Sequence, residues 1–300
     1  MSKIQAKDLI GSMVALVTPM HSDGSINFTQ WQKLIDWHIK CGTDALVVAG
    51  TTGESALLNT SEIATLVQTA VNSCQNTSTK VIVGTGAIVP DKVIQANQQA
   101  EELGADAALV VTPYYLTLTQ NALFEHFKYI ATHSKLPIIL YNVPSRTGID
   151  LKASTTVNLA KIPKILGIKE AKADMERIKK LVKIKDFIVL SGDDSSFVKA
   201  MLLGAHGVIS VAANARPKTI KNISNQIQLG NIIEAEELNK SLVSFYDFLF
   251  HEPNPCPIKA VMNAANIIDK GIRKPLVLTD LKPPHTNQQI KPICQEFNSL

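Results

Sequence analysis

Eight short apolar runs, each followed by an amphipathic segment, constrain the fold of this chain more than any other feature. The apolar runs cover residues 13–18, 45–48, 81–84, 107–111, 138–141, 165–169, 187–191 and 207–211. The intervening segments space their apolar residues as helices do, for example at 120–134 and 217–229. Strict alternation of strands and helices favours a parallel sheet. Eight such units in about 230 residues match a (β/α)8 TIM barrel.

Residues that begin and end helices support this assignment. Asn27 with Gln30, and Asn59 with Glu62, have the spacing of a capping box, and Gly42 follows a predicted helix end. Similar helix–glycine–strand joints recur as a weak internal repeat at 41–45, 103–107 and 203–207. A doubly wound open sheet is the alternative architecture. It is disfavoured because the chain has eight consecutive units and lacks a glycine-rich dinucleotide-binding loop.

Beyond residue 230 the alternation stops and helical patterns remain. We expect one helix over 232–250, a break at 252–257, a further helix from Ile258 and a short final helix after Pro283 and Pro284. The predicted organisation is therefore a barrel domain at 1–230 followed by a C-terminal helical domain at 231–300.

Composition and residue spacing argue against several classes of function. With 45% apolar residues, 19% charged residues and a net charge of +4, the chain is typical of a globular protein with an ample core. Its basic residues are not interleaved with aromatic residues, so we expect no nucleic acid partner. The histidines are scattered, and the cysteines at 41, 74, 256 and 294 have no paired spacing, which predicts free thiols and no metal. Without a bilayer-length apolar run or a signal-peptide core at 1–11, we expect a cytoplasmic protein with no membrane partner.

The run at 165–169 ends in a lysine, which is the first candidate for chemistry. Alternation along a strand would place Ile165, Gly167 and Lys169 on one face, and Gly167 would leave space beside the lysine. Burial at the end of an apolar strand disfavours the charged amine, and a neutral amine can form a Schiff base with a carbonyl compound. The alternative is an ordinary lysine that extends from a strand end into solvent. Glu170 alternates to the opposite face, and we assign it no catalytic role.

Other reactive side chains fall at the carboxyl ends of the predicted strands, where the active sites of such barrels lie. They are Thr51, Thr52, Tyr114, Tyr115, Tyr141 and Arg146. A phenol such as Tyr141 can move the protons that a Schiff base requires. Backbone amides of the turn at 50–53 can hold a carboxylate, and Arg146 can bind a second one bidentately. Each has a structural alternative. The segment at 50–53 would be only a tight turn, Tyr141 would fill the barrel, and Arg146 would form a surface ion pair.

Six stretches carry a resemblance to a known family. They are 50–55 (GTTGES), 111–115 (VTPYY), 141–148 (YNVPSRTG), 167–171 (GIKEA), 191–194 (SGDD) and 252–255 (EPNP). Together and in this order they closely resemble the 4-hydroxy-tetrahydrodipicolinate synthase (dihydrodipicolinate synthase) family of diaminopimelate and lysine biosynthesis, within the class I pyruvate-dependent aldolases. The resemblance implies a Schiff-base condensation of pyruvate with L-aspartate 4-semialdehyde without a cofactor. It also implies a homotetramer built from two tight dimers.

The resemblance further implies roles for individual residues. Lys169 would bind pyruvate covalently and Tyr141 would shuttle protons. Thr51 would link that phenol to Tyr115, which crosses the tight-dimer interface into the neighbouring site. The implied substrate-binding residues are Thr52, Arg146, Gly192 and the main chain of Ile209. Among them, Arg146 would bind the carboxylate of the semialdehyde, whereas the two threonines would hold the carboxylate of pyruvate.

One group of residues departs from the family pattern. In relatives that lysine inhibits, a pocket at the dimer interface holds free lysine with an asparagine, an acid and histidines. The matching positions here are Ser55, Ala56, Thr60, Ile63, Ile88, Lys92 and Tyr114. Lys92 would repel a cationic effector and Ile88 offers no hydrogen bond. We therefore expect lysine to inhibit this chain weakly or not at all.

Three other functions fit parts of the pattern. A sibling lyase, such as N-acetylneuraminate lyase or a 2-keto-3-deoxy sugar-acid aldolase, would share Lys169 and Tyr141 but has no need of Arg146. A non-catalytic barrel that senses a small acid would retain these groups without using them. A phosphate-binding barrel would favour glycines after the last strand, where residues 210–214 have none.

Overall fold

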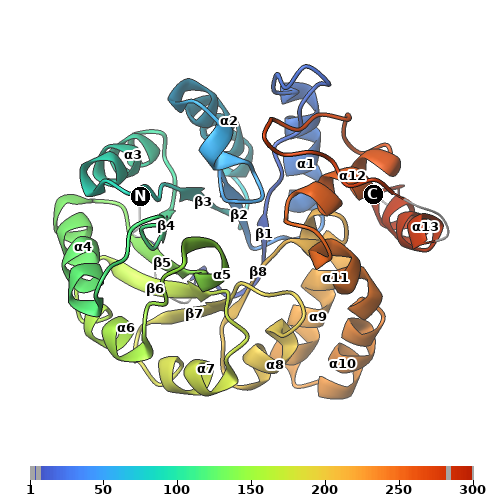
Figure 1. Ribbon diagram of the computed structural model, residues 1–300. Helices are drawn as coiled ribbons and strands as arrows, with labels where there is room; N and C mark the ends of the chain where they lie inside the picture. Colours follow the sequence, from blue (N-terminus) through green and yellow to red (C-terminus); the bar gives the residue numbers. More distant parts are fainter. Residues whose placement is uncertain (1–3, 5–7, 282–284, 299–300) are drawn as a thin grey trace.

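The computed structural model describes residue 4, residues 8–281 and residues 285–298. Eight parallel strands close into a barrel in sequence order, which confirms the predicted (β/α)8 architecture (Figure 1). The strands are β1 (Gly11–Ala15), β2 (Ala45–Val48), β3 (Lys80–Gly84), β4 (Ala107–Val111), β5 (Ile138–Asn142), β6 (Ile165–Glu170), β7 (Ile188–Ser191) and β8 (Gly207–Ser210). β1 pairs with both β2 and β8, and this pairing closes the barrel.

Helices follow the strands and pack around the outside of the barrel. They are α1 (Phe28–Lys40), α2 (Thr60–Cys74), α3 (Pro90–Glu102), α4 (Gln120–His133), α6 (Ala153–Leu159), α7 (Met175–Leu181), α8 (Phe197–Leu202) and α9 (Pro217–Leu229). Short helical turns, η2 (Ser55–Leu57), α5 (Pro144–Thr147) and η3 (Ala212–Asn214), lie in the loops after β2, β5 and β8. One apolar cluster fills the space between strands and helices, and a second fills the barrel interior. These packed cores give the loops at the carboxyl ends of the strands a rigid base.

The two predicted capping boxes have different outcomes. At α2, Asn59 accepts from the amide of Glu62 and Glu62 bonds back to the Asn59 amide, so this box is confirmed. At α1, Asn27 accepts from the amide of Gln30, but the Gln30 side chain donates to Asp269 at 2.8 Å instead of returning to Asn27. The reciprocal bond predicted at α1 is therefore wrong, because the Gln30 side chain bonds to Asp269 of the C-terminal segment instead.

The C-terminal segment is helical, but its predicted boundaries need correction. The single helix expected over 232–250 is two helices, α10 (Ile232–Lys240) and α11 (Val243–Phe250). Ser241 donates its hydroxyl to the carbonyl of Leu238, a local bond that competes with helix propagation, and the turn buries Leu242. The final helices are α12 (Cys256–Ala264) and α13 (His285–Asn298). α13 has 14 residues and is not short, and Pro283 and Pro284 lie outside the described residues.

Side-chain alternation in β6 is interrupted near its start. The register with β5 shifts between Ile138 and Ile139, so that Ile165 and Gly167 pair with consecutive residues of β5. Ile165 consequently packs in the outer cluster, whereas Leu166 packs against the barrel interior. The prediction that Ile165 shares the face of Lys169 is therefore wrong, because a bulge adds one unpaired residue to the strand.

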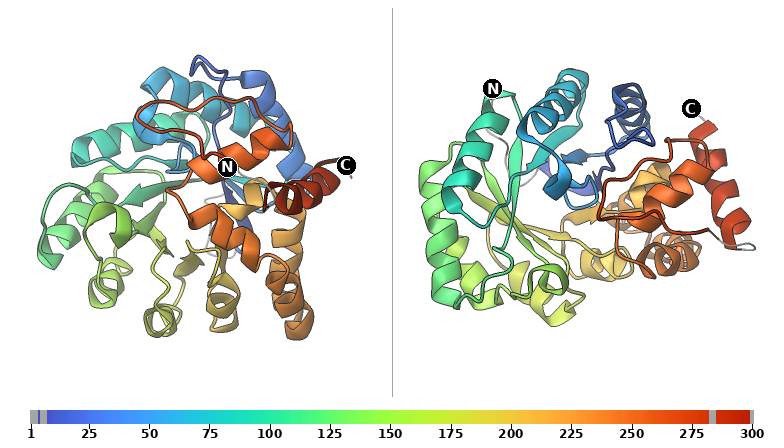
Figure 2. Two further views of the ribbon diagram at one scale, coloured as in Figure 1. Left: turned by 45° about the vertical axis from the view of Figure 1, so that its right-hand side comes forward. Right: turned by 45° about the horizontal axis from the view of Figure 1, so that its top comes forward.

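The C-terminal helices gather beside α1 and α9 at one side of the barrel in all views (Figure 2). α12 is anchored to the barrel through Lys259, which donates to the carbonyl of Thr18 after β1. Farther along, Arg273 binds Glu62 at the start of α2.

All four cysteines are free thiols, as expected. Within the described part of the chain, no helix combines the length and apolar character needed to span a membrane.

Candidate active site

A cavity of about 190 Å³ opens at the carboxyl ends of the strands. It is lined by six of the residues predicted from sequence, namely Thr51, Thr52, Tyr141, Arg146, Lys169 and Gly192. The other lining residues include Val143, Ser145, Asp193, Phe250 and Asn254. In Figure 1, α5 lies in front of the strands at this end of the barrel. The parallel topology thus brings together residues from seven of the eight strands or the loops that follow them, and residues of the C-terminal segment.

Lys169 and Tyr141 face each other across neighbouring strands. The two residues are direct partners in the β5–β6 pairing. The Nζ atom of Lys169 lies 4.5 Å from the centroid of the Tyr141 ring. Both residues are buried, with exposed fractions of 6% and 8%. This arrangement places an amine beside a phenol in a site that is largely shielded from water.

Space for the lysine depends on Gly192 rather than on Gly167. A Cβ atom at Gly192, after β7, would lie 2.8 Å from Cε of Lys169. A Cβ atom at Gly167 would instead lie 2.5 Å from the carbonyl oxygen of Ile188 on β7. The prediction that Gly167 makes room for Lys169 is therefore wrong. A glycine is needed at 167 because β6 and β7 approach each other closely there. The sequence could not show which of the two glycines borders the lysine, because that depends on how the strands pack.

Behind the strands, a buried polar network holds β5 against β6. Asn142 donates to Glu170 at 3.0 Å, and Arg177 on α7 donates to the same carboxylate at 3.2 Å. Arg177 also binds Asp150, which follows the loop that carries α5. Burial raises the pKa of Glu170 to about 7, although Arg177 and Asn142 oppose this effect. Glu170 thus points away from the cavity, as expected. Its hydrogen-bond network lies next to Tyr141 and Lys169, which are paired across β5 and β6.

The turn after β2 presents Thr51 and Thr52 to the cavity. Its internal hydrogen bonds use the amide of Gly53, which donates to the Gly50 carbonyl, and the amide of Glu54, which donates to the Thr51 carbonyl. The backbone amides of Thr51 and Thr52 donate to no group among the described residues. Of the predicted carboxylate-binding amides at 50–53, that of Gly53 is therefore excluded, because it is already bonded within the turn. The two threonine side chains add hydroxyl groups beside them.

Arg146 and Thr52 are connected by Asn254, a residue to which the sequence assigned no role. The Asn254 side chain donates to Oγ1 of Thr52 at 2.9 Å, and the Asn254 carbonyl accepts from the guanidinium of Arg146 at 2.9 Å. Its Oδ1 atom is buried without a partner in the described structure. The stretch 252–255 contributed to the family resemblance, which was the available signal. These contacts span 108 and 202 residues of sequence, so no local pattern predicts them.

Three candidate residues of the active site, Tyr114, Tyr115 and Ile209, are absent from the cavity lining. Tyr115 is 93% exposed and has a left-handed φ of 70°, so within one chain it does not reach the site. Ile209 is buried in the barrel interior on β8, and Val211 lines the cavity nearby. An exposed tyrosine held in an uncommon backbone conformation is available for contact with another molecule.

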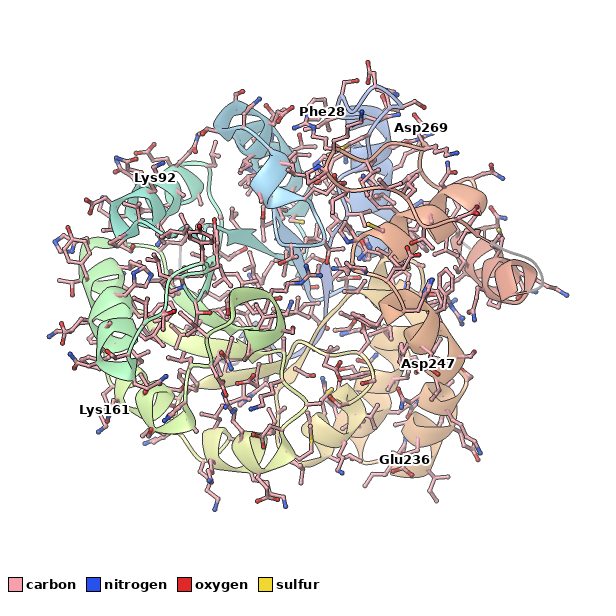
Figure 3. All side chains as sticks on the ribbon, viewed as in Figure 1. Phe28, Lys92, Lys161, Glu236, Asp247 and Asp269 are labelled. Atoms are coloured by element: carbon pink, nitrogen blue, oxygen red, sulfur yellow. The ribbon has the colours of Figure 1, made fainter. Side chains whose placement is uncertain are left out.

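The residues at the family's effector positions lie on η2, α2, the loop before α3, α3 and the loop after β4. Ala56, Thr60, Lys92 and Tyr114 are exposed, whereas Ser55, Ile63 and Ile88 are half-buried. Figure 3 shows Lys92 on α3 at the outer surface of the molecule. None of these positions lines the cavity that contains Lys169.

No metal ion is implied by the residues of the site. In the described ranges, no group of three or more histidine, cysteine, aspartate or glutamate side chains could hold one. The fold and the cavity define the class of (β/α)8-barrel proteins that carry a buried lysine side chain at the mouth of the barrel. Comparison with known proteins identifies the family, because residues 8–291 match the dihydrodipicolinate synthetase family. The chain belongs to this family.

Individual relatives agree over nearly the whole chain. The 4-hydroxy-tetrahydrodipicolinate synthase of Cellvibrio japonicus is 43% identical over 287 residues, which are 95% of this chain and 98% of the relative. The crystal structure of a chloride-inhibited dihydrodipicolinate synthase from Acinetobacter baumannii, complexed with pyruvate, aligns with a TM-score of 0.90 at 39% identity, over 97% of this chain and all of that one. A monomeric dihydrodipicolinate synthase variant aligns with a TM-score of 0.91 at 34% identity, over 98% of both chains. The predicted family and enzyme class are thus confirmed.

Proposed function

We propose that this chain condenses pyruvate with L-aspartate 4-semialdehyde through a Schiff base on Lys169. The observation that carries the proposal is the placement of Lys169 Nζ 4.5 Å from the Tyr141 ring, in a cavity that also exposes Thr51, Thr52 and Arg146. The pyruvate complex of the relative from Acinetobacter baumannii supports the first substrate. The enzyme class of the named relatives supports the reaction.

The proposed chemistry uses side chains alone. The Lys169 amine attacks C2 of pyruvate to give a carbinolamine, and Tyr141 transfers the proton that lets water leave. Loss of a C3 proton converts the resulting imine into an enamine. The enamine carbon attacks the aldehyde carbon of the semialdehyde, and the aldehyde oxygen takes up a proton to become a hydroxyl group. The substrate amino group then displaces Lys169 from the imine carbon, which closes the ring and frees the lysine.

The two carboxylates of the substrates are assigned to opposite sides of the cavity. Thr51 and Thr52, with their amides and hydroxyls, would hold the carboxylate of pyruvate. Arg146 would hold that of the semialdehyde, since a guanidinium binds a carboxylate with charge-assisted hydrogen bonds. Gly192 would leave room for the lysine and its adduct. In this scheme residues 1–230 carry the chemistry, and the helical segment at 231–300 supports both half-sites through Asn254.

Assembly is expected to complete the site. The exposed Tyr115 would enter the cavity of a second copy and extend the proton relay from Thr51, in a tetramer formed by two tight dimers. Sedimentation velocity tests this assembly, and a single monomeric species, the state of one relative, would refute it. Because pyruvate and the semialdehyde are metabolites of the cytoplasm, we place the reaction there, without a nucleic acid or membrane partner.

Borohydride trapping tests the proposal. Incubation with pyruvate and sodium borohydride should add a reduced pyruvyl group to Lys169, detected by mass spectrometry of peptides. Lys169→Ala should remove the adduct. The matched control is Lys161→Ala, since Lys161 lies on the outer surface (Figure 3) and should leave trapping unchanged. An unmodified Lys169 in the parent protein would refute the proposal. Turnover of N-acetylneuraminate in place of the semialdehyde would assign the chain to a sibling lyase instead.

A further inference from the structure

A buried ion pair lies behind the turn that carries Thr51 and Thr52. It joins Glu54, in that turn, to Lys259 on α12, and both side chains have an exposed fraction of 0%. Lys259 also donates to the carbonyl of Thr18 at 3.0 Å. Lysine and glutamate are almost never fully buried unless they are paired. The C-terminal helices therefore place a charged group directly against a loop of the barrel.

The second carboxylate oxygen of Glu54 is bonded as well. It accepts from the backbone amide of Arg273 at 3.0 Å, and the Arg273 guanidinium donates to the carbonyl of Leu57 at 2.7 Å. On the side of β1, the Thr18 hydroxyl donates to the carbonyl of Gly53 at 2.7 Å. The turn is thus held from the end of β1, from α12 and from the segment that follows α12.

The backbone of this turn needs such support. Ala49 and Glu54 both have left-handed φ angles, 52° and 59°, although neither is glycine. A residue that is not glycine is strained in this conformation and persists there only where the surroundings enforce it. Thr51 and Thr52 lie between these two positions and line the cavity, whereas Glu54 and Lys259 do not. The ion pair is therefore placed to act on the threonines through the backbone.

We propose that Glu54 and Lys259 are positioning residues for the pyruvate half-site, a proposal that rests on the function given above. The pair fixes the turn so that Thr51 and Thr52 present their amides and hydroxyls toward Lys169. Neither side chain lines the cavity, so neither contacts the reacting atoms, and both oxygens of Glu54 are used to hold Lys259 and the Arg273 amide. Buried ion pairs add little net stability compared with apolar pairs of similar volume. The main effect of this ion pair is therefore to fix the geometry of the turn.

Two variants separate positioning from stability. Lys259→Met leaves a buried unpaired carboxylate, which should lower Tm and raise the KM for pyruvate. Glu54→Met/Lys259→Met leaves no buried charge, so Tm should recover most of the loss. Neither methionine can bond to Thr18 or to the Arg273 amide, so the pyruvate KM of the double variant should stay at least tenfold above the parent. The kcat at saturating pyruvate should remain within about threefold, as expected for a loss of uniform binding.

Phe127→Leu provides the control for stability. Phe127 is buried on α4, remote from the turn in sequence and absent from the cavity lining, so this variant should lower Tm with an unchanged pyruvate KM. A double variant with the parental pyruvate KM would overturn the inference. If Lys259→Met does not fold, the double variant and Phe127→Leu decide the question. Absence of a borohydride adduct on Lys169 in the parent would instead refute the proposed function, which keeps the two failures distinct.

Discussion

Gly192→Ala should impair catalysis by displacing Lys169. An ideal Cβ atom at position 192 would lie 2.8 Å from Cε of Lys169. Carbon atoms in favourable contact are about 3.5–4.0 Å apart, so the end of the lysine must move by roughly 1 Å. A misplacement of that size reduces the rate about 100-fold, which corresponds to about 2.7 kcal/mol of activation free energy. The same Cβ would approach Ala171 at 3.0 Å, which should destabilise the fold by about 1–3 kcal/mol.

Gly230→Ala is the matched control for this substitution. Gly230 follows α9 with a φ of 82° and would place its Cβ with nothing within 4 Å. It should destabilise the fold by about 1–2 kcal/mol through its backbone conformation alone, with parental activity. Both variants are compared by urea unfolding, by kcat in the coupled assay and by the rate of borohydride trapping. A folded Gly192→Ala variant that traps pyruvate within threefold of the parental rate would show that Gly192 does not set the position of Lys169.

Three further predictions concern the second substrate, inhibition and pH. Arg146→Ala should raise the KM for the semialdehyde at least tenfold and leave pyruvate trapping intact, because Arg146 faces the second half-site; loss of trapping would reverse the assignment. Lysine should inhibit weakly or not at all in a steady-state assay, since Lys92 and Ile88 replace polar or acidic partners; an inhibition constant of about 1 mM or tighter would contradict this. Burial lowers the pKa of His38 to about 3, so the folded state resists the proton that the unfolded state takes up below about 6.5. Stability should therefore fall as pH drops, by up to about 1.4 kcal/mol per pH unit from this group, and His38→Gln should remove that part of the slope in denaturant unfolding at pH 7, 6 and 5.

The barrel and the centre of the site could be predicted because their signals are local. A strand leaves a short apolar run, and parallel strands bring their carboxyl ends to one edge, so Lys169 and Tyr141 had to lie near each other once the barrel was assigned. Arg146 and the two threonines were likewise candidates from their place after strands, and the resemblance of six stretches to a known family added Gly192 and Ile209. Helix ends were less predictable. The break between α10 and α11 depends on the burial of Leu242 and on a side-chain bond of Ser241, and neither changes the helical periodicity.

Contacts between distant segments could not be predicted. Asn254 bridges Thr52 and Arg146, and Lys259 meets Glu54 across 205 residues, because α12 packs against the loops of the barrel. The exchange of roles between Gly167 and Gly192 likewise follows from distances between neighbouring strands. The amino-acid order by itself determined the period of the elements and hence which residues stand at the strand ends. Tertiary structure decided which groups support those residues. The supporting groups come from distant segments that pack together, and such packing leaves no periodic pattern in the sequence of either segment.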